Sequence, residues 1–168
     1  MILAVDVQYS NNNAVAGGVV FEHWQDERPQ KEFISLIKGV EGYKPGKFFK
    51  RELPCILKLI SEHHLQPGCI VIDGFVFLDG ISEAGLGKYL YDALEGNVIV
   101  IGVAKNRYKN IDSKYEIYRG ISRKPLYVTV IGIDIEQAKR NILAMHGKFR
   151  LPTMIKSVDQ MCRSTKSD

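Results

Sequence analysis

Three carboxylates stand where an acidic side chain is costly unless another group compensates its charge. Asp6 lies in the middle of the apolar opening segment 1–9, and Asp73 ends the apolar run 69–72. Glu52 comes directly before a stripe of apolar residues at helical spacing. An isolated ionised carboxylate in an apolar setting costs several kcal/mol, roughly. Three carboxylates that converge would form an all-oxygen site, which suits Mg²⁺ or Mn²⁺ and does not suit zinc.

Such a site would act on phosphates. A divalent ion polarises a phosphate oxygen, lowers the pKa of bound water and stabilises a leaving oxygen. Lys105, after the apolar segment 97–103, would supply positive charge to a pentavalent phosphate. Simpler explanations exist for two of the carboxylates, because Asp73 could end a strand as a turn residue and Glu52 could favour a helix N-terminus. Asp6 has no such explanation, so the three together indicate a site.

The first half of the chain predicts an antiparallel meander followed by a helix. Segments 1–9, 14–22 and 33–37 are rich in strand-forming residues, and three asparagines at 11–13 predict a tight turn. Apolar residues then recur at helical spacing over 53–64, with Pro54 expected in the first turn of that helix.

The second half predicts buried strands alternating with helices. Segment 69–72 is fully apolar, which is typical of a buried parallel strand, and 97–103 is expected to be another apolar strand. The remaining expected elements are helices at 83–94, 135–145 and 154–163, an irregular segment with a hairpin at 104–125, and a strand at 126–131. This order predicts an α/β fold with a mixed sheet flanked by helices, and it matches the order of the ribonuclease H-like fold. Asp6 would lie mid-sheet, Asp73 at the carboxyl end of the neighbouring strand, and Glu52 at the start of the crossover helix.

Composition is that of a globular protein, and the 168 residues predict a single domain over 1–168. No apolar run approaches the ~18 residues of a membrane span, and Asp6 interrupts the apolar opening, so neither a span nor a signal peptide is expected. Cys55, Cys69 and Cys162 are odd in number and form no C-x-x-C pair. They predict reduced core thiols and a cytoplasmic protein.

A basic run at 105–124 holds seven lysines and arginines against two acids, with tyrosines interleaved through Tyr127. Cations bind phosphates and aromatic faces stack on bases, so the run suits DNA or RNA as a partner. Basic surface loops are common, however, and the run alone does not decide the matter.

These segments resemble, in order and spacing, the motifs of the endonuclease V family, and the resemblance covers essentially the whole chain. The matching segments are Asp6-Val7-Gln8-Tyr9, Tyr43-Lys44-Pro45-Gly46, Phe48-Phe49-Lys50-Arg51-Glu52-Leu53-Pro54, Ile72-Asp73-Gly74, Gly85-Leu86-Gly87-Lys88-Tyr89-Leu90, Ile101-Gly102-Val103-Ala104-Lys105-Asn106-Arg107, Lys124-Pro125-Leu126-Tyr127-Val128 and Phe149-Arg150-Leu151-Pro152-Thr153.

The resemblance implies a ribonuclease H-like, Mg²⁺-dependent nuclease acting on DNA or RNA that contains hypoxanthine. Cleavage would fall on the second phosphodiester 3′ to the deaminated base and leave 3′-hydroxyl and 5′-phosphate ends. Asp6, Glu52 and Asp73 would bind the metal, and Lys105 would stabilise the phosphate.

The same resemblance implies a substrate-binding role for the 43–46 turn. Tyr43, on a turn made rigid by Pro45, would fill the gap left by a base that has been everted into a pocket beside Gly46, Phe48 and Gly74. Eversion is required because a stacked base hides the edge that distinguishes hypoxanthine.

Several positions depart from the family pattern. Asp79 stands where the family usually has a histidine, so it would join the metal cluster or the substrate site as a carboxylate. The segment Phe75-Val76-Phe77 is bulkier than usual, the later Gly-His reads Gly132-Ile133, and the helix that usually precedes the first strand is missing. An apolar surface exposed there would suit a dimer interface. Two alternatives stay open, a structure-specific nuclease without inosine specificity and a nucleic-acid-binding protein that has lost catalysis.

Overall fold

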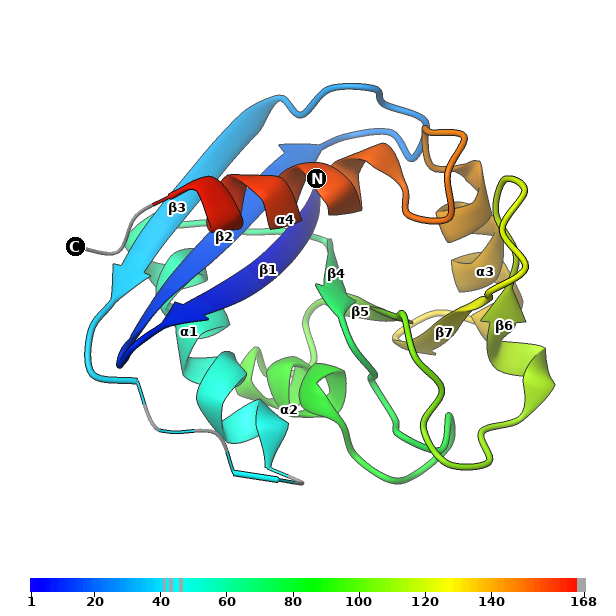
Figure 1. Cartoon of the computed structure of the whole chain (residues 1–168), viewed down its shortest axis with the longest axis horizontal. Helices are drawn as coiled ribbons and strands as arrows, with labels where there is room; N and C mark the ends of the chain where they lie inside the picture. Colours follow the sequence, from blue (N-terminus) through cyan, green and yellow to red (C-terminus); the bar gives the residue numbers. More distant parts are fainter. Residues whose placement is uncertain (41, 43, 46, 166–168) are drawn as a thin grey trace.

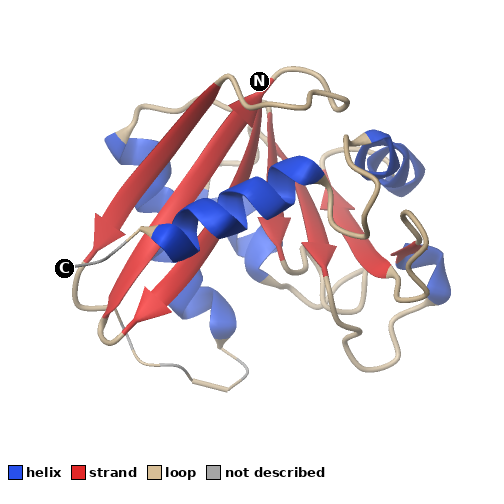
Figure 2. Ribbon diagram, turned by 45° about the horizontal axis from the view of Figure 1, so that its top comes forward, coloured by secondary structure: helices blue, strands red, loops and turns tan. Residues whose placement is uncertain are grey.

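A mixed sheet runs through the centre of the molecule, with helices on both faces (Figures 1 and 2). The computed structural model describes residues 1–40, 42, 44–45 and 47–165, with the backbone alone at position 48. Within these residues the strands are β1 (Ile2–Ser10), β2 (Asn13–Phe21), β3 (Lys31–Ile37), β4 (Cys69–Asp73), β5 (Ile99–Ala104), β6 (Glu116–Ile117) and β7 (Leu126–Ile131). The helices are α1 (Phe48–Glu62), α2 (Leu86–Ala93), α3 (Ile135–Ala144), α4 (Thr153–Ser164) and the 3₁₀ turn η1 (Ser113–Tyr115).

The strand order β3-β2-β1-β4-β5-β7-β6 confirms the predicted mixed sheet. The first three strands form the expected antiparallel meander, and β4 and β5 lie parallel to β1. Val5 pairs with Ile72, so the residues that follow, Asp6 and Asp73, occupy neighbouring positions on adjacent central strands. The topology therefore brings the first and third carboxylates together.

The sheet separates two apolar cores. One lies under α1 and α2 and includes Leu3, Ile56, Leu59 and Leu90; the other lies under α3 and α4. None of the helices in the described part of the chain combines the length and the apolar character that crossing a bilayer requires.

A glycine opposite Asp6 lets α4 approach the sheet closely. Gly17 pairs with Asp6 across the β1–β2 ladder, and a Cβ at position 17 would collide with the sulfur of Cys162 on α4. The Cys162 thiol in turn donates to the Asp6 carbonyl at 3.4 Å. Because position 17 carries no side chain, α4 lies directly over the strand that carries Asp6.

Helix α1 begins at Phe48, five residues before the start predicted from the sequence, so the placement of Pro54 in its first turn was wrong. The apolar stripe continues backward through Phe49, and this side of the helix packs on the sheet. Pro54 lies inside the helix, where its ring nitrogen cannot donate to a carbonyl in the preceding turn. Glu52 consequently projects from the body of the helix toward the sheet and is buried.

Helix α3 depends on a side-chain cap. The Asp134 carboxylate accepts from the backbone N–H groups of Glu136 at 3.0 Å and Gln137 at 3.3 Å. We expect Asp134→Ala to lower the free energy of unfolding by about 1 kcal/mol, because two amide groups lose their acceptor. Urea unfolding would measure this, and Asp134→Ser, which retains an acceptor, should keep most of the stability. Equal losses in both variants would contradict this role.

Candidate active site

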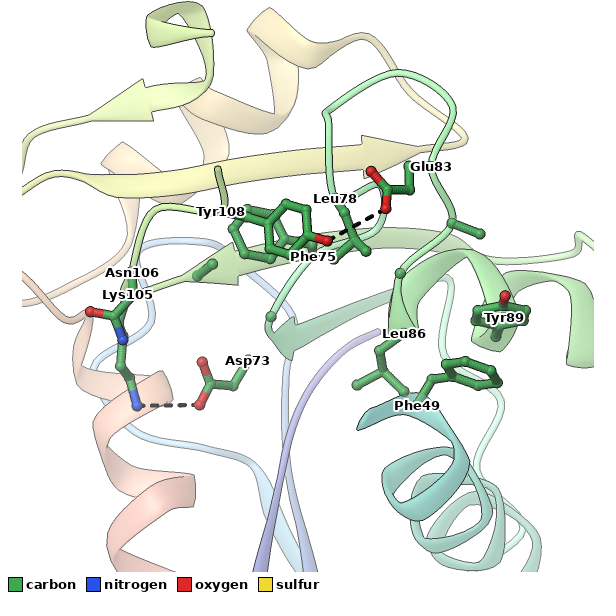
Figure 3. A pocket seen from close by; sticks show the side chains of 14 residues that line it. Phe49, Asp73, Phe75, Leu78, Glu83, Leu86, Tyr89, Lys105, Asn106 and Tyr108 are labelled. Atoms are coloured by element: carbon green, nitrogen blue, oxygen red, sulfur yellow. Dashed lines mark hydrogen bonds and ion pairs between the residues drawn. The ribbon is translucent and has the colours of Figure 1, made fainter. Parts of the chain in front are cut away.

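The three carboxylates singled out from the sequence lie near enough to one another to influence one another's ionisation. Asp6 comes from β1, Glu52 from α1 and Asp73 from the end of β4, and the first two are only 7% and 5% exposed. Figure 3 shows Asp73 at the edge of a pocket, pointing toward Lys105. These elements meet because β1 and β4 are adjacent and α1 is the crossover between the meander and β4.

The pKa values of the buried acids reflect both their burial and their charged neighbours. Burial raises the pKa of the Asp6 carboxyl to about 6, with the hydrogen bond from Gln8 opposing the rise and the charge of Asp73 adding to it. Burial raises the pKa of Glu52 further, to about 9, and the charges of Asp6 and Asp73 contribute. Oε2 of Glu52 is buried without a hydrogen-bond partner among the described residues. A buried acceptor of this kind is expected where a cation or proton completes the site.

A fourth carboxylate, Asp159 on α4, joins the group. The Gln8 amide Nε2 donates to Asp6 Oδ2 at 3.1 Å and to Asp159 Oδ1 at 3.2 Å, so it bridges the two acids. Burial opposes ionisation of Asp159, but hydrogen bonds from Arg163 and toward Asp6 hold its pKa below the usual range. The sequence analysis missed this residue, because an Asp–Arg pair four residues apart on an amphipathic helix is typical of a solvent-exposed face.

Lys105 follows the end of β5, as expected from the sequence, and lies next to the third carboxylate. Its ammonium Nζ is 3.2 Å from Asp73 Oδ2. The guanidinium of Arg150 donates to the Lys105 carbonyl, so the loop before α4 fixes the backbone of the lysine. The lysine is thus held beside the carboxylates by both its side chain and its main chain.

The basic run at 105–124 only partly behaves as predicted. Tyr115 and Tyr127 are buried in a small core and cannot stack on bases. Arg119 is also buried, and its guanidinium donates to the carbonyls of Met145 and Phe149 at 2.6 and 2.7 Å. These three residues are structural, and this leaves Tyr108, which lines the pocket, and Tyr118 as accessible aromatics.

The donor set suits a divalent metal ion. All four carboxylates offer hard oxygen ligands, and the orphaned Glu52 oxygen points to a missing partner. Within the described part of the chain, no three His, Cys, Asp or Glu side chains already lie close enough together to hold an ion. The carboxylates would therefore have to move closer together to share one, and Asp73 would have to exchange its contact with Lys105.

Beside Asp73 and Lys105 lies a pocket of about 690 Å³ (Figure 3). This volume is in the range of about 300–1,000 Å³ that small-molecule sites occupy. Phe49 and Tyr89 stack with ring centroids 3.9 Å apart on one side of it. The lining residues are Phe49, Asp73, Gly74, Phe75, Leu78, Glu83, Ala84, Gly85, Leu86, Tyr89, Ala104, Lys105, Asn106 and Tyr108.

The predicted substrate residues fall into three groups. Gly74 lines the pocket, and its φ of +132° is a conformation that favours glycine. Pro45 is exposed in the segment before α1. Tyr43 and Gly46 lie outside the described residues, as does the side chain of Phe48, so their expected roles stay predictions.

Asp79 has a structural role that its position in the sequence did not suggest. Its carboxylate accepts from the backbone N–H groups of Ile81, Ser82 and Glu83 at 2.8–2.9 Å and from the Ser82 hydroxyl. These bonds hold its pKa well below the usual range. The oxygens of Asp79 are used within its own loop and it lines a smaller cavity that adjoins the pocket, so these contacts do not favour a place in the metal cluster. Its expected role toward the substrate stays a prediction.

The sheet order, with acidic residues on neighbouring central strands, defines a protein of the ribonuclease H-like class. The family model for endonuclease V matches residues 1–132, and the chain belongs to the endonuclease V family. An endonuclease V from Streptomyces avermitilis is 29% identical over 144 residues, covering 72% of this chain and 60% of the relative.

Solved structures agree with this assignment. The crystal structure of endonuclease V from Streptomyces avermitilis has a TM-score of 0.73 at 26% identity, over 96% of this chain and 79% of that one. A Ciona intestinalis endonuclease V, solved with a 24-mer DNA containing an inosine followed by a ribo-adenosine, has a TM-score of 0.79 at 19% identity, over 96% and 84%. The chain spans about 60% of the length of the curated relatives it matches.

Proposed function

We propose that this protein is an endonuclease that hydrolyses a phosphodiester near a deaminated base, hypoxanthine, in DNA or RNA. The observation that carries the proposal is the group of carboxylates, with Asp6 and Glu52 buried and Lys105 beside Asp73, at the edge of a pocket large enough for a base. Membership of the endonuclease V family supports the same reading. The Ciona relative supports a nucleic acid as the partner, since it was solved with inosine-containing DNA.

The carboxylates of Asp6, Glu52 and Asp73 would hold Mg²⁺, or Mn²⁺, with Asp159 beside them. When bound, such an ion polarises a phosphate oxygen and makes bound water more acidic. The fit rests on the oxygen-only donor set and on the unpaired Glu52 oxygen. Burial, with repulsion from neighbouring carboxylates, raises the pKa values of Asp6 and Glu52, and a divalent cation would favour their charged forms.

The remaining residues would position the substrate. The Lys105 ammonium, 3.2 Å from Asp73, can turn toward a phosphate that approaches the carboxylates and stabilise its negative charge. Gln8, bridging Asp6 and Asp159, would hold both acids in orientation while the substrate binds. The pocket would receive a base removed from its stack, so that the base edge becomes accessible.

Cleavage of oligonucleotides tests this proposal. Strands with a single inosine, and matched strands with adenosine, would be incubated with the protein in Mg²⁺, in Mn²⁺ and in EDTA. We expect cuts near the inosine in either metal and none in EDTA. Equal cutting of both strands would favour the structure-specific nuclease, and salt-sensitive binding without any product would favour the binding protein.

Lys105→Met should slow cleavage by roughly 10- to 100-fold, because the phosphate loses a cation that stabilises charge in the transition state. Single-turnover rates at saturating protein would measure this loss apart from binding. Lys124→Met is a matched control, since Lys124 is exposed in the same basic region. Equal rates for Lys105→Met and Lys124→Met would contradict a role for Lys105 in the reaction.

A further inference from the structure

Glu83, which is exposed, and Tyr108, which is partly buried, form a polar pair on the lining of the pocket. The Tyr108 hydroxyl donates to Glu83 Oε1 at 3.4 Å, and Figure 3 shows the two groups meeting above Phe75 and Leu78. Both residues line the 690 Å³ pocket and also the adjoining cavity of about 250 Å³. The pair therefore stands at the junction of the two cavities, across the pocket from the Phe49–Tyr89 stack.

Two positions that depart from the family pattern build this pair. Asp79 accepts from the Glu83 N–H at 2.9 Å, and the Leu78 N–H donates to the Glu83 carbonyl at 2.7 Å. These two bonds close the 78–83 loop and fix the backbone of Glu83. Phe75 lies against Tyr108, with ring centroids 6.2 Å apart. Asp79 and Phe75 depart from the family pattern in the sequence. In the structure, Asp79 holds the loop that carries Glu83, and Phe75 packs against Tyr108.

The pair offers one acceptor and one donor side by side. An ionised carboxylate only accepts hydrogen bonds, while a tyrosine hydroxyl can donate. Their mutual contact of 3.4 Å is longer than the usual O–H···O distance of about 2.7–2.8 Å, so it is weak and readily exchanged for a ligand. The complementary ligand edge carries an N–H donor next to a carbonyl acceptor.

We propose that Glu83 and Tyr108 are specificity-determining residues that read the edge of a 6-oxopurine seated in this pocket. Glu83 accepts the N1–H and Tyr108 donates to O6. The inference rests on the proposed function, since it takes the pocket's occupant to be an everted base. Adenine seated in the same way places the N1 lone pair against the carboxylate, and two acceptors that face each other without a proton between them are disfavoured.

Guanine carries the same N1–H and O6 and adds a 2-amino group that a carboxylate can also accept. A strand with an unpaired guanosine is therefore included beside the inosine and adenosine strands. Glu83→Gln should weaken recognition of both 6-oxopurines and leave binding of the adenosine strand little changed.

Binding is measured first in EDTA, by fluorescence anisotropy with strands that differ only in one unpaired base. We expect the wild-type protein to prefer the inosine strand over the adenosine strand. Glu83→Gln replaces a charged acceptor with a weaker neutral one, and Tyr108→Phe removes a donor. Each should reduce that preference about tenfold, which corresponds to about 1.4 kcal/mol. The same ratio is then measured as relative cleavage rates in Mg²⁺.

A second Tyr–Glu pair provides the control. Tyr118 donates to Glu116 Oε2 at 3.3 Å, and neither residue lines the pocket. Glu116→Gln and Tyr118→Phe should leave the base preference unchanged. The proposal is overturned if Glu83→Gln and Tyr108→Phe retain the wild-type preference, or if the wild-type protein binds all three strands equally. Loss of cleavage with the preference intact would instead count against the proposed nuclease function alone.

Discussion

Asp6→Ala should abolish metal-dependent cleavage, lowering the rate by a factor on the order of 10³ or more while the chain stays folded. A bound metal contributes several kcal/mol to a phosphoryl transition state, and each ~1.4 kcal/mol is a factor of ten in rate. Asp6 is the acid at the centre of the group, next to Asp73 in the sheet and bridged to Asp159 by Gln8. Removing the Asp6 carboxylate would therefore disrupt a set of ligands that comes from several different strands and helices.

Folding should survive this change because alanine removes a costly buried charge together with the hydrogen bond that Asp6 accepts from Gln8. Its carboxyl is 7% exposed with its pKa raised to about 6, so near pH 7 the metal-free protein holds a buried charge at that position. Asp6→Asn is the closer variant, since its amide oxygen still accepts from Gln8. Both variants should unfold at a temperature no lower than that of wild type.

Single-turnover cleavage of the inosine strand in Mg²⁺ is the measurement, with circular dichroism to establish folding. Asp92→Asn is the control, since Asp92 is an exposed acid paired with Lys88 on α2. If folded Asp6→Ala protein cuts the inosine strand at the wild-type rate, the site assignment is wrong.

The fold was largely predictable because it depends on local patterns. Apolar runs of strand length and stripes at helical spacing marked the main elements, and their order indicated the ribonuclease H-like sheet. Three residues of the candidate site could be singled out in the sequence, because acids at Asp6, Glu52 and Asp73 contradict their apolar surroundings. Such contradictions are visible in sequence and are expected at functional sites.

The parts of the site that were missed depend on contacts between distant segments. Asp159 lies 151 residues from Gln8 and is indistinguishable in sequence from a surface acid. Arg119 appeared to be one of several surface cations, yet it is buried and binds carbonyls of the loop before α4. The Glu83–Tyr108 contact likewise joins two loops that no periodic pattern places together. These residues are recognised only when the three-dimensional structure shows their partners.

Glu52→Gln should make the metal-free protein more stable at alkaline pH, even though it removes a ligand of the proposed metal. Burial, with the charges of Asp6 and Asp73, raises the pKa of Glu52 from its usual 4.5 to about 9 in the folded chain. Between these values the folded state retains a proton that the unfolded state has released. The contribution of Glu52 to the stability of the wild-type protein is therefore greatest below about pH 4.5. This contribution falls as the pH rises toward 9.

Glutamine has the shape of protonated glutamate and does not titrate, so the variant should lack this part of the pH dependence. At pH 8 in EDTA we expect Glu52→Gln to exceed wild type in free energy of unfolding by on the order of 3 kcal/mol, with little difference at pH 5. The corresponding shift in melting temperature would be roughly 10 °C for a chain of this size. Thermal unfolding at several pH values measures both.

Adding Mg²⁺ should reverse the comparison. Metal binding to the folded state alone stabilises it by mass action, so the wild-type melting temperature at pH 8 should rise with Mg²⁺ while that of Glu52→Gln changes much less. Glu32→Gln, a change at an exposed acid of β3, should follow the wild-type protein under both conditions. Parallel pH profiles for wild type and Glu52→Gln in EDTA would show that Glu52 does not retain its proton. If Mg²⁺ still raises the melting temperature of Glu52→Gln as much as that of the wild type, the unpaired Glu52 oxygen has no part in binding the metal. The metal would then be bound by the other carboxylates.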